Sequence, residues 1–311
     1  MKAWAIIFTC MFFISLIGFT VTAAVTGVDI INDVIRGNYT WDSYDVTRTF
    51  ESDYSNIEIG VLSARTNITL SSDGITRVNY TGNKNFSNVE FTAEISGNTL
   101  IIKEKGNFAV IGWNWGWNLG FSRNGGQTTL DIELPQEAFG KIDINLTSGR
   151  INAELPETDN LYVNITSGNV TLNYNHDNIA SHLKSHATSG TITINGFAPE
   201  TFDIYSTSGR QNITGLAGSG SVRLTSGSAN IDFAEWNGSL NVKITSGNAT
   251  ITVPAGSGAD FRFSRTSGSL RYNMDGDSGR MNSSGSASAG GSNRQRVDVD
   301  LTSGSAEIKT R

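Results

Sequence analysis

The tripeptide Thr-Ser-Gly recurs through the C-terminal part of the chain and constrains its fold more than any other feature. Eight copies and one worn copy, Ser283-Ser284-Gly285, end in the glycines at positions 149, 168, 190, 209, 227, 247, 268, 285 and 304. Successive glycines are 19, 22, 19, 18, 20, 21, 17 and 19 residues apart. A fixed period of a few tens of residues is typical of repeat architectures, in which each repeat packs only against its neighbours.

The residues on both sides of each tripeptide alternate between apolar and polar, as in strands that bury one face. Ile144 and Leu146 precede the first copy, and Ile151 and Ala153 follow it. Because Leu146 and Ile151 are separated by an odd number of positions, the buried parity changes across the tripeptide. A straight strand cannot do this. We therefore expect a corner at Thr-Ser-Gly, with a positive φ at the glycine and hydroxyl groups that satisfy free backbone groups.

Two arrangements would place two strands, a corner and a turn in every repeat. Consecutive hairpins would produce an open sheet of about eighteen strands, whereas open sheets rarely exceed about ten. In a solenoid, equivalent strands of successive coils stack in parallel about 4.8 Å apart. The sequence therefore predicts an all-β, single-stranded β-solenoid, or β-helix, of about twenty-residue coils over residues 136–311.

Residues 37–135 lack the tripeptide but keep the alternation, for example at Ile57 and Ile59 and again at Ile132 and Leu134. They predict a less regular N-terminal β cap that is continuous with the solenoid. Near the other end, the composition of residues 275–293 indicates a flexible linker, while the position of Gly285 favours a degraded coil. We expect residues after 293 to form the last coil, so that Lys309 and Arg311 charge an open edge.

The N-terminal segment, residues 1–27, is the clearest targeting signal. No charged residue occurs from Ala3 to Val28, which is long enough for a membrane-spanning helix of about 20 residues. A cleaved signal peptide is the alternative, because Val21-Thr22-Ala23 supplies a small-residue cleavage pattern. Either interpretation exports the rest of the chain, and Lys2 favours a cytoplasmic N-terminus.

The cysteine count and the net charge bear on lipidation, disulfide bonds and nucleic-acid binding. The only cysteine, Cys10, lies too early in the apolar segment to be a lipidation site. The exported part therefore has no disulfide, and its stability must come from packing and backbone hydrogen bonds. A net charge of −6 without a basic stripe excludes nucleic acid as a partner, since phosphates require clustered lysines and arginines.

Two stretches carry a resemblance to a known family. They are Ile132-Glu133-Leu134-Pro135 followed by the segment from Lys141 to Ile151, and the segment from Ser55 to Gly82. Over roughly residues 45–311 the chain resembles the bacterial β-strand-repeat family described as putative adhesins of unknown function. The resemblance implies a β-solenoid on the outside of a bacterial envelope, sometimes tied to envelope-stress signalling. It supplies no catalytic residues.

Trp113, Trp115 and Trp117 alternate with small or polar residues and would share one face of a strand. They are the candidate binding residues, as an exposed aromatic platform for carbohydrate or for a membrane interface. The alternative is that they cover one end of the hydrophobic core.

Histidines and serines offer weaker signals. His176, His182 and His186 fall in the longest repeat, but their spacing matches no metal motif, so no metal and no cofactor are predicted. The serines beside glycine repeat without an orienting base, which indicates architecture instead of catalysis.

The chain is therefore expected to be a non-enzymatic adhesin or surface-binding scaffold, anchored in the cell membrane or secreted if residues 1–27 are cleaved. Its expected partners are a cell-envelope polymer, a host surface or a membrane protein. An envelope-stress sensor that acts through protein partners is the alternative, and a polysaccharide-acting enzyme on a β-solenoid is the third.

Overall fold

The computed structural model describes residues 43–51, 54–83, 89–106, 128–176 and 179–311. The chain divides into two units, Met1–Ser43 and Tyr44–Arg311, and apart from Ser43 all strands lie in the second. In the described ranges all the regular elements are β-strands, and none is a helix with the length and apolar character that a membrane crossing needs. The predicted anchor at residues 1–27 lies outside the described residues.

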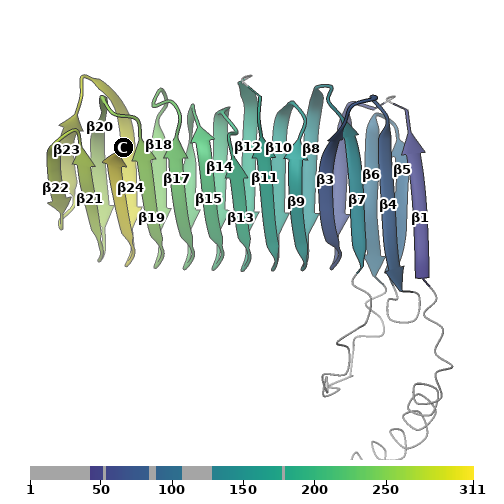
Figure 1. Ribbon diagram of the computed structural model, residues 1–311. Helices are drawn as coiled ribbons and strands as arrows, with labels where there is room; N and C mark the ends of the chain where they lie inside the picture. Colours follow the sequence, from purple (N-terminus) through teal and green to yellow (C-terminus); the bar gives the residue numbers. More distant parts are fainter. Residues whose placement is uncertain (1–42, 52–53, 84–88, 107–127, 177–178) are drawn as a thin grey trace, which may run out of the picture. The chain divides into compact units, whose positions relative to one another are not determined.

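The strands form two sheets (Figure 1). Sheet A contains, in spatial order, β1 (Ser43–Phe50), β4 (Thr76–Asn83), β7 (Thr129–Pro135), β3 (Arg65–Ser71), β9 (Arg150–Leu155), β11 (Asn169–Tyr174), β13 (Thr191–Asn195), β15 (Arg210–Leu216), β17 (Ser228–Phe233), β19 (Asn248–Val253), β25 (Ser305–Thr310), β21 (Ser269–Met274) and β22 (Asp277–Met281). Sheet B contains, in spatial order, β23 (Gly285–Gly290), β20 (Ser257–Arg265), β24 (Asn293–Leu301), β18 (Leu240–Ile244), β16 (Ser219–Leu224), β14 (Pro199–Ser206), β12 (Ala180–Ala187), β10 (Thr158–Ile165), β8 (Phe139–Leu146), β2 (Asn56–Val61), β6 (Thr99–Gly106) and β5 (Val89–Ser96).

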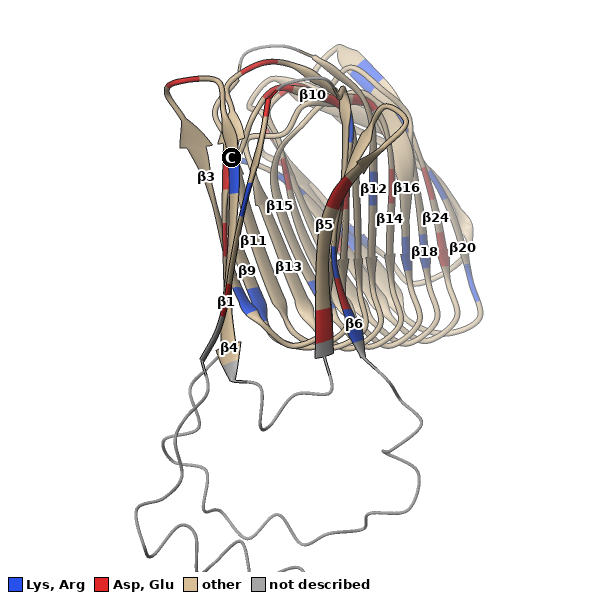
Figure 2. Cartoon of the chain, turned by 90° about the vertical axis from the view of Figure 1, so that its right-hand side faces the viewer, with Lys and Arg blue, Asp and Glu red and all other residues tan. Residues whose placement is uncertain are grey.

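Each repeat is one coil of a solenoid, as predicted. The chain passes along a strand of sheet B, turns at Thr-Ser-Gly, follows a strand of sheet A and returns through a variable turn (Figure 2). Equivalent strands of successive coils pair in parallel, so β8, β10 and β12 are neighbours in one sheet and β9, β11 and β13 in the other. Parallel pairing between coils excludes the hairpin arrangement.

Corners are joined from coil to coil by backbone hydrogen bonds. The Ser167 N–H donates to the Thr147 carbonyl at 2.8 Å, and the Ser208 N–H donates to the Thr188 carbonyl at 2.8 Å. These bonds, instead of the side-chain hydroxyl groups expected from the sequence, satisfy most of the corner backbone. The stacked corners therefore form a continuous ladder along one edge of the solenoid.

Glycine is needed at the corner mainly because the previous coil lies so close. A Cβ added to Gly227 would lie 2.4 Å from the Gly209 carbonyl oxygen, and one on Gly190 would lie 2.2 Å from that of Gly168. Three corner glycines do have a φ in the left-handed region, as predicted, but Gly190 and Gly227 do not. The prediction of a positive φ was thus wrong for corners such as those at Gly190 and Gly227. At these corners glycine is required because the backbone of the previous coil lies too close for a Cβ.

The core lies between the two sheets. Along a typical strand such as β9 the side chains alternate between exposed and buried, and the buried ones belong to one hydrophobic cluster that extends through all the coils. Trp236, in the turn before β18, covers the core, with its indole Nε1 donating to the Gly258 carbonyl at 2.7 Å. Burial on one face of each sheet leaves the other face of each available to solvent.

The C-terminal strands do not form the last coil, which corrects the prediction for Lys309 and Arg311. β24 pairs with β18 and β20, and β25 pairs with β19 and β21, so the final coil is inserted one place inside the solenoid. Arg311 binds Asp232 on β17, with the guanidinium Nη2 and carboxylate Oδ1 2.7 Å apart. The degraded coil is β22 and β23, which run antiparallel to their neighbours.

The predicted cap follows the same plan in reverse. β2 and β3 form a regular coil beside β8 and β9, and β6 and β7 form the next coil. β4 and β5 then pair antiparallel with β7 and β6. Both ends of the solenoid thus carry an antiparallel return. At the N-terminal end, exposed Glu90 and Glu94 on the edge strand β5 charge the edge that parallel addition would require (Figure 2).

Candidate binding surface

The predicted aromatic platform at Trp113, Trp115 and Trp117 lies outside the described residues. It stays a prediction. The structure instead reveals aromatic side chains on the outer face of sheet B, on strands that the repeat itself positions.

Four rings gather there on three adjacent strands, and we call them the aromatic patch: Tyr162 on β10, His182 and His186 on β12, and Tyr205 on β14. The ring centroids of Tyr162 and His182 are 5.9 Å apart, and those of His186 and Tyr205 are 4.7 Å apart. Tyr205 is 38% exposed, a high value for so large a side chain. The patch presents ring faces and edges on a rigid parallel sheet.

The repeat explains why these residues meet. His186 and Tyr205 each stand two positions before the threonine of their own corner, so parallel stacking places them opposite one another. Asn164 and Asn145 occupy the same position in the two preceding coils, and their amide groups are hydrogen bonded at 3.2 Å. Alignment of the repeats on Thr-Ser-Gly would have predicted the contact between His186 and Tyr205 from the sequence. The spacing of the three histidines alone does not predict it.

Neighbouring charged and hydroxyl groups contact the rings of the aromatic patch and shift the pKa values of two of them. The Lys141 ammonium lies 5.6 Å from the centre of the Tyr162 ring, within the range of a cation–π contact. Burial, together with the positive charge of Lys184, holds the pKa of His186 below its usual value, so this ring is neutral at pH 7. Hydrogen bonds from the hydroxyl groups of Thr207 and Thr225 lower the pKa of Tyr205.

The three histidines make different contacts. The His176 ring Nε2 lies 3.1 Å from the Leu155 carbonyl oxygen. The His186 Nε2 is buried and has no hydrogen-bond partner among the described residues. Over the described part of the chain, no group of three histidine, cysteine, aspartate or glutamate side chains could hold a metal ion.

His182 forms a contact that resembles a catalytic pair. Its Nδ1 lies 2.9 Å from the Thr201 Oγ1, but that hydroxyl donates its proton to the Ser181 carbonyl at 3.0 Å. The histidine must then donate to the hydroxyl oxygen instead of accepting from it. Thr201 is therefore not activated as a nucleophile in this arrangement.

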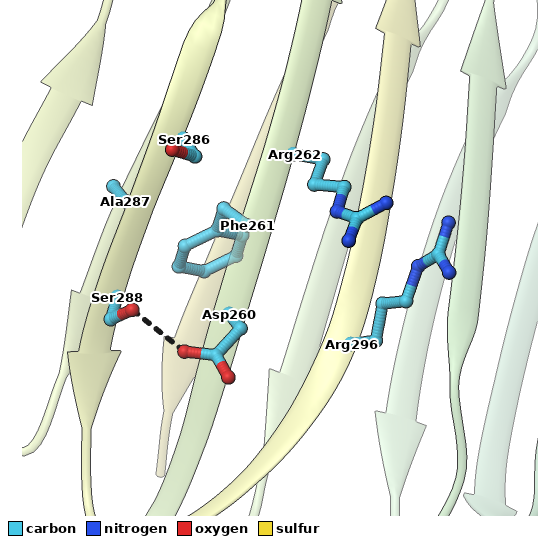
Figure 3. A pocket seen from close by; sticks show the side chains of 7 residues that line it. All are labelled: Asp260, Phe261, Arg262, Ser286, Ala287, Ser288 and Arg296. Atoms are coloured by element: carbon cyan, nitrogen blue, oxygen red, sulfur yellow. Dashed lines mark hydrogen bonds between the residues drawn. The ribbon is translucent and has the colours of Figure 1, made fainter.

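A second feature of the same face is a trough at its C-terminal end (Figure 3). It encloses about 590 Å³ and is lined by Asp260, Phe261, Arg262, Ser286, Ala287, Ser288 and Arg296. The side chains of β23 are small, which creates the depression beside the longer side chains of β20 and β24. The Ser288 hydroxyl donates to the Asp260 carboxylate at 2.7 Å.

The chain is similar to several known proteins. A model of the Toastrack DUF4097 family matches residues 54–309. No curated protein matches the sequence. Solved structures that match include a putative lipid binding protein from Parabacteroides distasonis ATCC 8503, with 16% identity, 86% of this chain and 96% of that chain covered, and a TM-score of 0.49. A putative adhesin from Bacteroides fragilis NCTC 9343 matches with 14% identity, coverage of 86% and 97%, and a TM-score of 0.46.

Proposed function

Because the chain belongs to the Toastrack DUF4097 family, we propose that it is a non-catalytic adhesin-type scaffold that binds a saccharide polymer of the cell envelope or of a host surface. The observation that supports this proposal is the aromatic patch on the outer face of sheet B. Aromatic rings offer apolar faces to the C–H faces of sugars, and neighbouring amides and hydroxyls bind sugar hydroxyl groups.

The position of the patch suits such a role. Tyr162 and Tyr205 project from strands of a sheet that is paired on both sides, so their backbone is held by hydrogen bonds to the neighbouring coils. Binding groups on strands are held more precisely than groups on loops. Asn145 and Asn164 extend the patch with amide donors and acceptors.

The proposal also covers location. Residues 1–27 would hold the protein at the cell membrane, with the solenoid on the outer side, or would be removed on secretion. In both cases the aromatic patch would face polymers outside the cytoplasm.

The test is a binding screen of purified full-length protein, in detergent micelles, against glycans, cell-wall fragments and host-surface glycoproteins. Tyr162→Ala/Tyr205→Ala removes the two phenol rings from the patch. Asn212→Ala/Asn230→Ala is the matched control, because these residues form a hydrogen-bonded pair on the outer face of the opposite sheet. A triple change of Trp113, Trp115 and Trp117 to alanine tests the platform predicted from the sequence.

We expect the tyrosine variant to lose binding while it keeps its β-sheet circular dichroism spectrum, and the asparagine control to bind normally. Loss only in the tryptophan variant would move the binding site to the predicted platform. Absence of binding to every glycan and wall fragment would reject the saccharide-binding scaffold and favour a sensor that acts through protein partners.

A further inference from the structure

The C-terminal end of the solenoid has two edge strands, β22 in sheet A and β23 in sheet B. Within the described ranges each pairs with a strand on one side only, and Figure 1 shows them together at the end opposite β1. The free side of an edge strand presents backbone N–H and C=O groups to which a further strand can bond. This end is therefore a surface on which another pair of sheet edges could be added.

The two ends of sheet B differ in charge. Edge strands that avoid pairing with other chains usually carry charged side chains or proline. β5, at the N-terminal end, has exposed Glu90 and Glu94. β23 has the sequence Gly-Ser-Ala-Ser-Ala-Gly, without a charge or a proline, and its small side chains leave the backbone accessible. The C-terminal edge thus lacks the protection that the N-terminal edge has.

The turn before β22 determines which of its backbone groups are free. β21 and β22 are joined by the two-residue turn Asp275-Gly276, with φ values of 48° and 87°. A turn of this kind is closed by a hydrogen-bonded pair, here Met274 and Asp277. Bonded and non-bonded pairs alternate along an antiparallel ladder. The N–H and C=O groups of Ser278 and Arg280 therefore point to the free edge.

The neighbouring strand β20 determines the free groups of β23. The Ser257 carbonyl accepts the Gly291 N–H at 3.1 Å, on the side of β20 where β23 lies. The next carbonyl, that of Gly258, instead accepts the Trp236 indole N–H at 2.7 Å. Because successive carbonyls of a strand point to opposite sides, the odd-numbered residues of β20 are the ones that bond to β23.

The register of β20 and β23 carries this alternation along the edge strand. Phe261 lies opposite Ala287, so Ala287 bonds to β20. The N–H and C=O groups of Ser286 and Ser288, on either side of Ala287, point to the free edge. Both edges therefore offer the same arrangement, with two outward-facing residues that flank one inward-bonded residue.

The centres of the two edges lie at the same level. Tyr272 of β21 pairs with Gly279 of β22, and Phe261 of β20 pairs with Ala287 of β23. The rings of Phe261 and Tyr272 stack across the core with their centroids 5.3 Å apart. Gly279 and Ala287 therefore occupy matching positions on the two edges. One axis perpendicular to both sheets can pass close to both residues.

A two-fold axis in this position would relate the chain to a second copy of itself. It would place β22 antiparallel to the β22 of the second copy, and likewise for β23. Ser278 would lie opposite Arg280 of the other copy, and Ser286 opposite Ser288, so that no two like charges are directly opposed. A single peptide strand could pair with only one edge, whereas a second copy presents two edges with the same spacing.

The end of the core would also be covered. Met281 on β22 and Ala287 on β23 are partly buried side chains that pack against the hydrophobic cluster at this end. Strands added to both sheets would remove them from water, which favours association.

We propose that the chain forms a symmetric dimer through its C-terminal end, in which β22 and β23 pair with the same strands of a second copy. The contact lies apart from the aromatic patch on β10, β12 and β14 and does not require the saccharide-binding role proposed above. The strands at the opposite edges, β1 and β5, take no part in it.

The experiment is sedimentation velocity of the full-length protein in detergent micelles, at concentrations from about 1 to about 100 µM. Ser278→Pro removes an N–H that faces the free edge of β22 and keeps the bonds to β21, since proline is tolerated on edge strands where the N–H faces solvent. Ser278→Ala is the matched control, because it changes the side chain and keeps the N–H. Ser288→Pro and Ser288→Ala form the same pair on β23.

We expect a concentration-dependent equilibrium between monomer and dimer in the unmodified protein. Each proline variant should keep its β-sheet circular dichroism spectrum and raise the dissociation constant of the dimer about tenfold or more, and each alanine control should raise it less than about twofold. Tyr162→Ala/Tyr205→Ala should leave the dimer unchanged, which separates this contact from the saccharide-binding role.

A monomer at every concentration would overturn the proposal. A dimer that both proline variants leave intact would also overturn it, because the contact would then lie elsewhere in the chain. Equal losses in the proline and alanine variants would exclude backbone pairing. Weakening by only one of two folded proline variants would overturn the two-edge contact. If one proline variant lost its β-sheet spectrum, the variant on the other sheet would decide.

Discussion

Glu104 on β6 closes the corner ladder at its N-terminal end, and its removal should be among the most destabilising single changes in the protein. Glu104 is only 6% exposed. Carboxylate Oε2 accepts the backbone N–H groups of Leu62, Ser63 and Ala64 at 2.6, 2.9 and 3.3 Å. Carboxylate Oε1 accepts the Tyr80 hydroxyl at 3.0 Å. In the regular coils the corner N–H groups donate to backbone carbonyls of a neighbouring coil, and here a carboxylate replaces them.

The magnitude follows from the donors left behind. Glu104→Ala leaves several buried or half-buried donors without their acceptor, each costing about 1–3 kcal/mol when water cannot replace it. Because Ser63 is exposed and water can reach part of the corner, we expect a loss of about 3–5 kcal/mol in the free energy of unfolding, the range for breaking a buried charged network. Glu104→Gln keeps one oxygen for the corner and should cost about 1–2 kcal/mol.

Urea unfolding of the full-length protein, followed by circular dichroism, measures these differences. Tyr80→Phe removes the phenol hydroxyl and should cost about 1 kcal/mol. Glu90→Ala, an exposed glutamate on β5, is the control and should change stability by less than about 0.5 kcal/mol. The reasoning is refuted if Glu104→Ala costs no more than the Glu90 control, because the carboxylate would then not be the acceptor that completes the ladder.

Three further predictions concern a corner glycine, the C-terminal strands and His186. Gly227→Ala should lower the free energy of unfolding by about 1–3 kcal/mol, because the added methyl group would overlap the preceding corner. Gly285→Ala is the control in the same urea assay and should change the free energy of unfolding by less than about 0.5 kcal/mol, because its nearest neighbour would be the Met281 Cε at 3.9 Å. Deletion of residues 293–311 removes β24 and β25, which are internal strands of the two sheets, and should abolish the cooperative unfolding transition measured by circular dichroism. A shortened protein that still unfolds cooperatively would contradict the observed strand order. Because the pKa of His186 is lowered in the folded protein, the unfolded chain binds a proton at this ring more readily, and the stability should fall as the pH drops through about 6.5. His186→Asn should reduce the change in urea midpoint between pH 7.5 and pH 5.5. An unchanged difference between the two midpoints would contradict the role of His186 in the pH dependence.

Local pattern was enough to predict the coils. The alternation around Ile144 and Leu146, and the change of parity at Thr147-Ser148-Gly149, require two strands on different sheets with a corner between them. The regular spacing of the corners favoured parallel stacking over hairpins, because hairpins would have produced an open sheet of about eighteen strands. The pairing of successive coils then confirmed the parallel arrangement. The outer positions of the aromatic patch follow from the same alignment.

The order of the end coils was decided only by tertiary structure. Backbone hydrogen bonds do not depend on side-chain identity. The residues of β24 therefore do not by themselves predict that this strand pairs between β18 and β20 instead of forming the edge of sheet B. The same holds for Glu104, whose corner partners are about forty positions away in the chain, and for Arg262 and Arg296, which become neighbours only through that insertion. The sequence by itself determined the coil, its corner and its buried face, because each depends on residues within one repeat. Pairing between distant coils produced the capped ends and the trough at the C-terminal end of sheet B.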